Sequence, residues 1–360
     1  MAIREIKPLT GLRGVAAISV VALHVSGSLN SHKLWATHDF LLKNLIAGGD
    51  FAVDIFFMLS GFVLMINYMN LESKTKFFVY RFARIFPLNT FVLSMMAFGV
   101  FILEKSGFHF SQQDYSYFKF KYLPYHFLLI FVWLGMPIAW NGPAWSLSAE
   151  TFAYCFFPAI RWLLRNLKHV QIAVILVILI ILQTSNLVLM GFEVTGADAL
   201  LRACLGFFVG AGISLININV EKQFYLPDLF ALSILILICA GFPELAVFPA
   251  AMLIHVLRSP GASIIHKTLG SNNIVRLGRW SYSIYLLHAP LLIGSLIVLR
   301  HLHSFQSGWR LGLFFAFYAL LVVISSAFSY RLVENPSRYY LQNVWKRMNR
   351  AERRASHEVG

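Results

Sequence analysis

Residues 12–24, LRGVAAISVVALH, form an apolar stretch with a cation near its start and an imidazole at its end. No side chain between Arg13 and His24 is ionisable. Their spacing of 11 residues is close to three helical turns, so a helix would project both from one face, roughly 16 Å apart along its axis. An ionisable group at membrane depth is costly, and it is retained where it faces the interior of a helix bundle. The stretch predicts a retained membrane helix with a functional polar face.

The composition extends this prediction to the whole chain. Of 360 residues, 58% are hydrophobic and 13% are charged, whereas soluble domains carry about 25% charge. The net charge of +14 comes mainly from short loops and the C-terminus, which indicates membrane topology and contact with the lipid bilayer rather than with nucleic acid. The three cysteines lie in apolar segments without metal-ligand spacing, so no metal is expected.

Hydropathy predicts an all-α polytopic membrane protein, a bundle of about ten transmembrane helices with both termini cytoplasmic. The expected multi-pass location is the inner (cytoplasmic) membrane. Residues 1–338 would form the transmembrane domain and residues 339–360 a basic cytoplasmic tail. Segment 124–139 is short and contains a proline, and the positive-inside rule favours a re-entrant or interfacial piece on the outer side. The spans are expected at 9–28, 46–69, 86–103, 143–164, 169–190, 199–217, 225–241, 244–258, 281–300 and 311–332.

Two acidic residues lie within the expected spans. Asp54 falls at a depth similar to that of His24, where a carboxylate could orient the imidazole and stabilise its protonated form. Glu150 shares a helix face with Ser146 and could position a hydroxyl or tune His24. A structural hydrogen bond between helices remains the simpler alternative for either acid.

Two further polar patterns point to a site open to the cytoplasm. Arg81 and Arg84 are i, i+3 neighbours, and paired guanidinium groups suit phosphate oxygens, although both could simply anchor the topology. Tyr285 and His288 lie on one face of an expected helix, in a polar stripe that could line a channel or satisfy internal hydrogen bonds. Trp145 suits an interfacial aromatic belt. The outer segment 106–127 is crowded with aromatic residues, which suit either sugar surfaces or the same belt.

These motifs, taken in order, resemble the acyltransferase-3 family of integral membrane acyltransferases. The matching stretches are LRGVAAISVVALH, VDIFFMLSGFVL, RFARIFP, PAWSLSAE, SYSIYLLHAP and VENPSR. The resemblance implies about ten helices and transfer of an acyl group, commonly acetyl, from cytoplasmic acyl-CoA to a hydroxyl of a glycan or another acceptor. It implies that His24 is catalytic, that Arg81 and Arg84 hold the donor, and that Trp145, Ser146 and Glu150 form a second motif of the site.

Together, the residues and the resemblance predict an O-acyltransferase acting on a carbohydrate, either a cell-surface polysaccharide or a lipid-linked precursor. Arg13 would help the arginine pair to hold the donor phosphates, and the acyl-bearing arm would pass Tyr285 and His288 to reach His24. The imidazole would act as a general base or accept the acyl group covalently, and it must be neutral in both cases. A proton-coupled transporter or flippase of a polysaccharide precursor is the main alternative, and a non-catalytic assembly scaffold is another.

Overall fold

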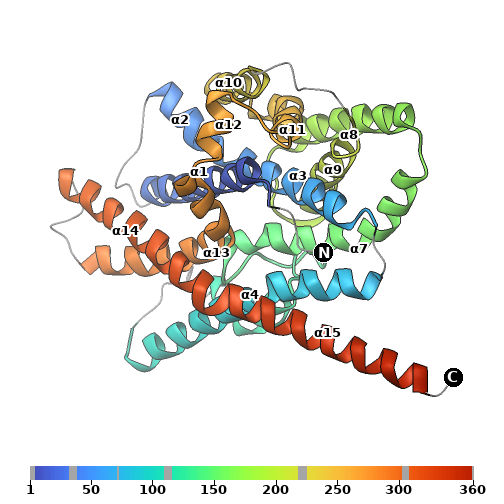
Figure 1. Cartoon of the computed structure of the whole chain (residues 1–360). Helices are drawn as coiled ribbons and strands as arrows, with labels where there is room; N and C mark the ends of the chain where they lie inside the picture. Colours follow the sequence, from blue (N-terminus) through green and yellow to red (C-terminus); the bar gives the residue numbers. More distant parts are fainter. Residues whose placement is uncertain are drawn as a thin grey trace.

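The regular structure of the described residues is helical, with no strand among them. The computed structural model describes residues 5–31, 39–70, 73–108, 116–217, 225–301 and 308–358, of which 299–301, 308 and 350–358 are described by their backbone alone. The all-α fold expected from the sequence is confirmed. Figure 1 shows α1 (Lys7–Ser31), α3 (Gly49–Tyr68) and α13 (Asn272–His301) near the middle of the bundle.

Every apolar segment expected to span the membrane coincides with a helix. Seven of the described helices or helix pairs are long and apolar enough to cross a bilayer, and the chain is a multi-pass membrane protein. The count of ten spans and the cytoplasmic termini stay predictions. The seven are Lys7–Ser31, Phe40–Tyr68, Lys74–Lys105, His169–Met190, Gly196–Ile213, Asn272–Val298 and Trp309–Asn349. The other helices that match an expected span are α7 (Trp145–Arg165), α10 (Leu226–Cys239) and α11 (Val247–Val256).

Segment 124–139 forms no spanning helix. After η1 (Phe120–Tyr122) and α6 (Leu123–Phe127), its backbone runs through turns that bury Leu129 and Val132 against α7. Ser148 of α7 donates to the Leu129 carbonyl at 2.7 Å and accepts from the Val132 N–H at 3.3 Å. Irregular backbone is tolerated at membrane depth where protein groups satisfy it, so this packing suits a re-entrant piece.

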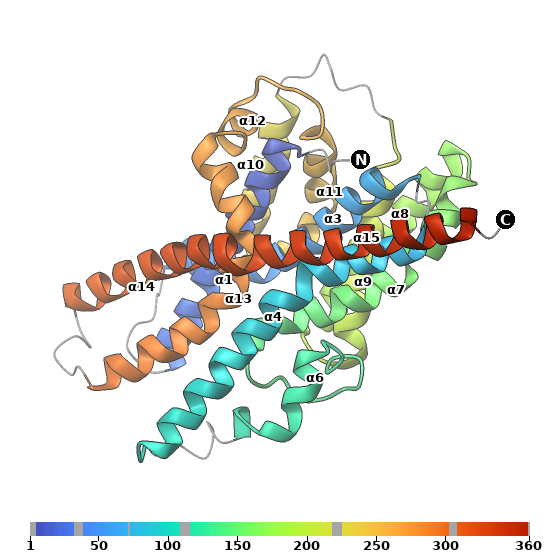
Figure 2. The same ribbon diagram turned by 60° about the horizontal axis from the view of Figure 1, so that its bottom comes forward.

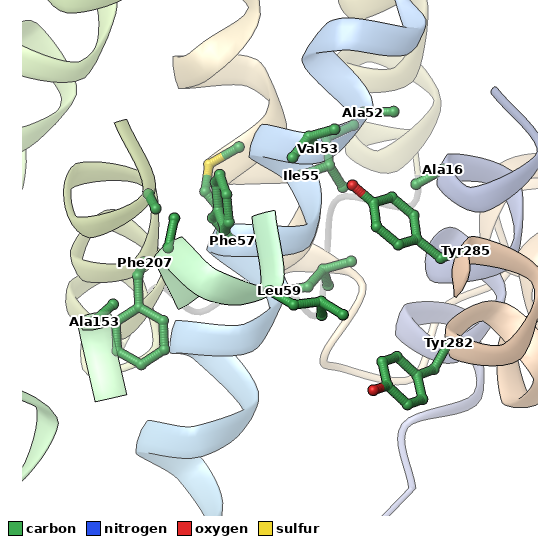
Figure 3. Close-up of a cluster of buried hydrophobic side chains, with 14 of the residues drawn as sticks. Ala16, Ala52, Val53, Ile55, Phe57, Leu59, Ala153, Phe207, Tyr282 and Tyr285 are labelled. Carbon is green, nitrogen blue, oxygen red and sulfur yellow. The ribbon is translucent and has the colours of Figure 1, made fainter. Parts of the chain in front are cut away.

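Glycines let the central helices approach closely. A Cβ built on Gly61 of α3 would lie 1.8 Å from the Phe207 carbonyl oxygen of α9 (Gly196–Ile213). A Cβ on Gly278 of α13 would lie 1.8 Å from the backbone carbonyl oxygen of Thr10 in α1. Small residues at such crossings bring backbones together in membrane bundles, and Figure 3 shows the buried side chains around them.

The C-terminal helices form one long rod. In Figures 1 and 2, α14 (Gly308–Ser329) and α15 (Asn335–Glu358) follow one line across the molecule, joined by the π-helical turn η5 (Tyr330–Glu334). Helix α15 packs against α4 (Lys74–Lys105). The domain boundary expected after residue 338 falls inside α15 and stays a prediction.

Candidate active site

A cavity of about 160 Å³ lies among α1, α3, α4, α7 and α13. It combines apolar walls with an unusual number of polar side chains for membrane depth. It brings together six of the residues expected at the site, which come from four different helices. The polar and aromatic lining consists of Arg13, Ser60, Asn67, Tyr68, Arg81, Arg84, Ser146, Glu150, Tyr154, Ser281, Tyr282 and Tyr285, together with Phe56 and Phe57.

Three arginines converge on this cavity. Arg13 comes from α1, whereas Arg81 and Arg84 come from neighbouring positions on one face of α4. The Arg81 guanidinium lies over the Tyr68 ring at 5.4 Å and donates to the Tyr68 hydroxyl at 3.3 Å. In the described part of the chain, none of the three arginines forms an ion pair. Guanidinium groups without a carboxylate partner are available to bind phosphate oxygens.

The start of α4 is held in place by α13. Pro87 lies inside α4 and lacks the N–H that would continue the helical hydrogen bonds. The Tyr282 hydroxyl donates to the nearby Ile85 carbonyl at 2.5 Å, one residue beyond Arg84. Figure 3 shows Tyr282 and Tyr285 projecting from the same side of α13. The tyrosine thereby fixes the register of the arginine pair against the cavity wall.

Ser146 and Glu150 of α7 both line the cavity, as their shared helix face predicts. The Ser146 hydroxyl lies 2.7 Å from the Tyr285 hydroxyl. Glu150 accepts a hydrogen bond from Tyr154 at 2.7 Å and interacts electrostatically with Arg13. The acid therefore lies with the arginines, and no described contact joins it to His24.

The two histidines lie next to each other, outside the cavity lining and adjacent to its residue Tyr285. The ring centroids of His24 and His288 are 5.0 Å apart, and those of His288 and Tyr285 are 5.9 Å apart. His288 is fully buried, and its Nε2 has no described hydrogen-bond partner. Tyr285 of the cavity wall thus contacts His288, and His288 contacts His24.

The backbone of α1 sets the tautomer of His24. Its Nδ1 lies 2.9 Å from the Val20 carbonyl oxygen, which can only accept a hydrogen bond. The neutral ring must therefore carry its proton on Nδ1, which leaves the lone pair on Nε2. This is the form that a general base or a nucleophile requires.

Asp54 does not pair with His24, and the expected pairing is corrected. The Asp54 carboxylate is fully buried and lies 2.7 Å from Nη2 of Arg202 on α9. It also accepts from Nε of Arg202 at 3.1 Å and from the Gln183 amide at 2.9 Å. A buried carboxylate is stabilised far more by a guanidinium than by a neutral imidazole, so α9 provides the partner.

Arg202 is the residue that the sequence analysis missed. It is a single arginine inside the apolar segment 199–217, the same signal that singled out Arg13. Its guanidinium lies over the rings of Trp145 at 5.3 Å and Phe192 at 4.9 Å. Trp145 is therefore a buried packing partner of the ion pair and does not line the cavity. Its contact with substrate stays a prediction.

A second carboxylate lies near the imidazole. Asp50, one turn before Asp54, interacts electrostatically with both His24 and Arg202. Its backbone carbonyl accepts from Arg202 at 2.8 Å. Among the residues whose positions are described, no group of three or more His, Cys, Asp and Glu side chains could hold a metal ion.

Comparisons with known proteins place this chain in a family. A family model described as an acyltransferase domain matches residues 6–331. An acyltransferase of Streptomyces mycarofaciens, MdmB, is 28% identical over 83% of this chain and 80% of its own length. A putative O-acetyltransferase of Staphylococcus aureus (strain COL) is 22% identical over 93% of this chain and 58% of its own length. No solved structure matches. The chain belongs to the acyltransferase-3 family of membrane acyltransferases.

Proposed function

We propose that the protein transfers an acyl group, acetyl in the first instance, from cytoplasmic acyl-CoA to a hydroxyl of a carbohydrate acceptor. The observation that carries the proposal is one continuous arrangement. Three arginines with no described ion-pair partner share a cavity, and Tyr285 and His288 join that cavity to an imidazole with a free Nε2 lone pair.

The donor would enter with its anionic end against the arginines. Arg13, Arg81 and Arg84 suit the phosphates of coenzyme A, since guanidinium groups form paired, charge-assisted hydrogen bonds with phosphate oxygens. The apolar walls of the cavity suit the narrow pantetheine arm of the donor. This arrangement requires the arginine side to face the cytoplasm, in keeping with cytoplasmic termini in an inner-membrane protein.

His24 would carry out the transfer. As a general base, Nε2 takes the proton of the acceptor hydroxyl while that oxygen attacks the thioester carbonyl. The C–S bond then breaks, and the coenzyme A thiolate takes the proton back from the imidazolium. As a nucleophile, Nε2 instead attacks the thioester carbonyl and expels the coenzyme A thiolate, which leaves an acyl-imidazole. The acceptor oxygen then attacks the acyl group, the C–N bond breaks, and the hydroxyl proton passes to the thiolate. His288, 5.0 Å away, would line the path of the acyl group.

The chemical identity of the acceptor is the most specific part of the proposal. The S. aureus relative is named a putative O-acetyltransferase, which favours acetyl and a hydroxyl acceptor. A carbohydrate, as a cell-surface polysaccharide or a lipid-linked precursor, is favoured by the aromatic segment 106–127, of which residues 109–115 lie outside the described residues.

The decisive experiment uses purified protein in nanodiscs, radiolabelled acetyl-CoA and a panel of lipid-linked and free oligosaccharides. His24→Ala should lower acetyl transfer by about 10²–10⁴-fold, the usual contribution of a general base. His169→Ala, which alters a histidine at the start of α8 (His169–Met190), is the matched control and should retain full activity.

The same assay separates the enzyme from its rivals. Acetylated product that depends on both the protein and His24 supports the proposal. Acceptor movement across the membrane without consumption of acetyl-CoA would identify a transporter or flippase. Substantial turnover by a correctly folded His24→Ala variant would remove His24 from the mechanism.

A further inference from the structure

The late motif VENPSR, residues 333–338, places a buried acid behind the donor cavity. Glu334 ends the π-helical turn η5, and its side chain is 3% exposed. Its Oε2 accepts a hydrogen bond from the Ser283 hydroxyl of α13 at 2.8 Å. Single π-turns inside α-helices are frequent at functional sites.

The neighbours of Glu334 belong to the cavity wall. Ser283 lies between Tyr282 and Tyr285, which both line the cavity. The turn η5 packs on α4, the helix that carries the arginine pair, as well as on α13. The carboxylate interacts electrostatically with Arg84 and with Arg13. Glu334 therefore acts on the donor site from outside the space that a ligand would fill.

The cavity region contains more cations than acids. Arg13, Arg81 and Arg84 face Glu150 within it and Glu334 behind it. In the residues covered by the structure, both ion pairs closer than 4.0 Å lie elsewhere, so these acids act on the arginines from a distance. Three partly buried guanidinium groups are costly in a medium of low dielectric constant, and nearby carboxylates lower that cost.

We propose that Glu334 is a positioning residue that compensates the charge of Arg84 and Arg13 while the donor site is empty. This inference rests on the proposed function, since it assigns the arginines to an anionic donor. The carboxylate is held to α13 by Ser283 and forms no direct ion pair with a described residue, so it does not occupy the guanidinium groups. They remain free to bind phosphates when acyl-CoA arrives.

This role has a consequence that a purely structural acid would not share. Removing the charge should destabilise the empty protein but strengthen anion binding. The size of the change in affinity follows from Coulomb's law. A unit charge roughly 10 Å from a charge on the ligand, in an effective dielectric constant of about 20, changes binding roughly tenfold. Glu334→Gln keeps an oxygen to accept the Ser283 hydrogen bond and removes only the charge.

The experiment measures melting temperature and coenzyme A affinity of purified variants in nanodiscs. Glu334→Gln should melt at a lower temperature without ligand, bind coenzyme A roughly tenfold more tightly, and recover stability when coenzyme A is added. Ser283→Ala is the matched control, because it removes the hydrogen bond and leaves the charge. It should not tighten binding. If Glu334→Gln does not fold without ligand, purification with coenzyme A should restore the folded protein, and failure to fold even then would overturn the compensating role.

Inorganic pyrophosphate serves as a second probe, so that the two proposals can fail separately. Wild-type protein that binds pyrophosphate but not coenzyme A would overturn the proposed function, and the variants would still test Glu334 through pyrophosphate. Unchanged or weaker anion binding by Glu334→Gln, with a uniformly lower melting temperature, would overturn the compensating role. Failure of the wild type to bind either anion would overturn both.

Discussion

Replacing Arg202 by methionine tests whether the Asp54–Arg202 pair is structural or catalytic. The substitution leaves the fully buried Asp54 carboxylate with the Gln183 amide as its remaining described side-chain donor. Breaking a buried pair by removing one partner costs about 3–5 kcal/mol, because the other charge stays in the interior without compensation. We expect Arg202→Met to lower the free energy of unfolding by that amount.

The reciprocal change should cost a similar amount. Asp54→Leu leaves the guanidinium between the rings of Trp145 and Phe192 with backbone carbonyls as its described acceptors. The double variant Asp54→Leu/Arg202→Met replaces the whole pair by apolar side chains. Such replacement is often close to neutral, so the double variant should lose less stability than either single variant.

Denaturant unfolding in detergent micelles measures the four free energies, and acetyl transfer per folded molecule is measured on the same samples. A structural pair predicts a large coupling energy, with turnover of the double variant within a few-fold of wild type. Additive losses would refute the assignment of the pair to stability. Full stability of Asp54→Leu with abolished turnover would restore the catalytic role that the sequence suggested.

Two smaller predictions concern helix packing and pH. Gly61→Ala should lower stability by about 1–3 kcal/mol because its Cβ would meet the Phe207 carbonyl at 1.8 Å, whereas Gly99→Ala, with no described atom within 4 Å, should be neutral or stabilising in thermal unfolding. The hydrogen bond from Arg279 lowers the pKa of Glu5, so the contribution of this exposed pair is present above pH 4.5 and is lost at lower pH. It amounts to less than about 1 kcal/mol. Unfolding from about pH 7 to about pH 3 should therefore show a slightly weaker pH dependence for Glu5→Gln, and an unchanged dependence would contradict the assignment.

Local periodicity made much of the site predictable. The i, i+3 spacing of Arg81 and Arg84 and the i, i+4 spacing of Ser146 and Glu150 depend on one helix each, and both pairs line one cavity. The face of a helix follows from its own sequence because the turn has a fixed period. The helical segments themselves were predictable for the same reason, since hydropathy requires no knowledge of neighbours.

The partners of the acids were not predictable in this way. Asp54 and Arg202 are separated by 148 residues, and nothing in either segment indicates that α3 and α9 meet. Their contact depends on close packing at Gly61 and Gly210, where backbones of the two helices touch. The similar expected depth in the membrane suggested His24, and α1 is in fact packed on α3 as well. Depth alone does not determine which neighbouring helix a side chain faces.

The positions of the acids follow a common physical rule. Both carboxylates that the sequence analysis assigned to His24 interact with arginines, Asp54 in an ion pair with Arg202 and Glu150 electrostatically with Arg13. In a medium of low dielectric constant, a permanent cation stabilises a carboxylate more than a neutral imidazole does. His24 instead takes its orientation from the Val20 carbonyl of its own helix. A buried acid in a membrane chain should therefore be matched first to the buried arginines, because the imidazole can be oriented without one.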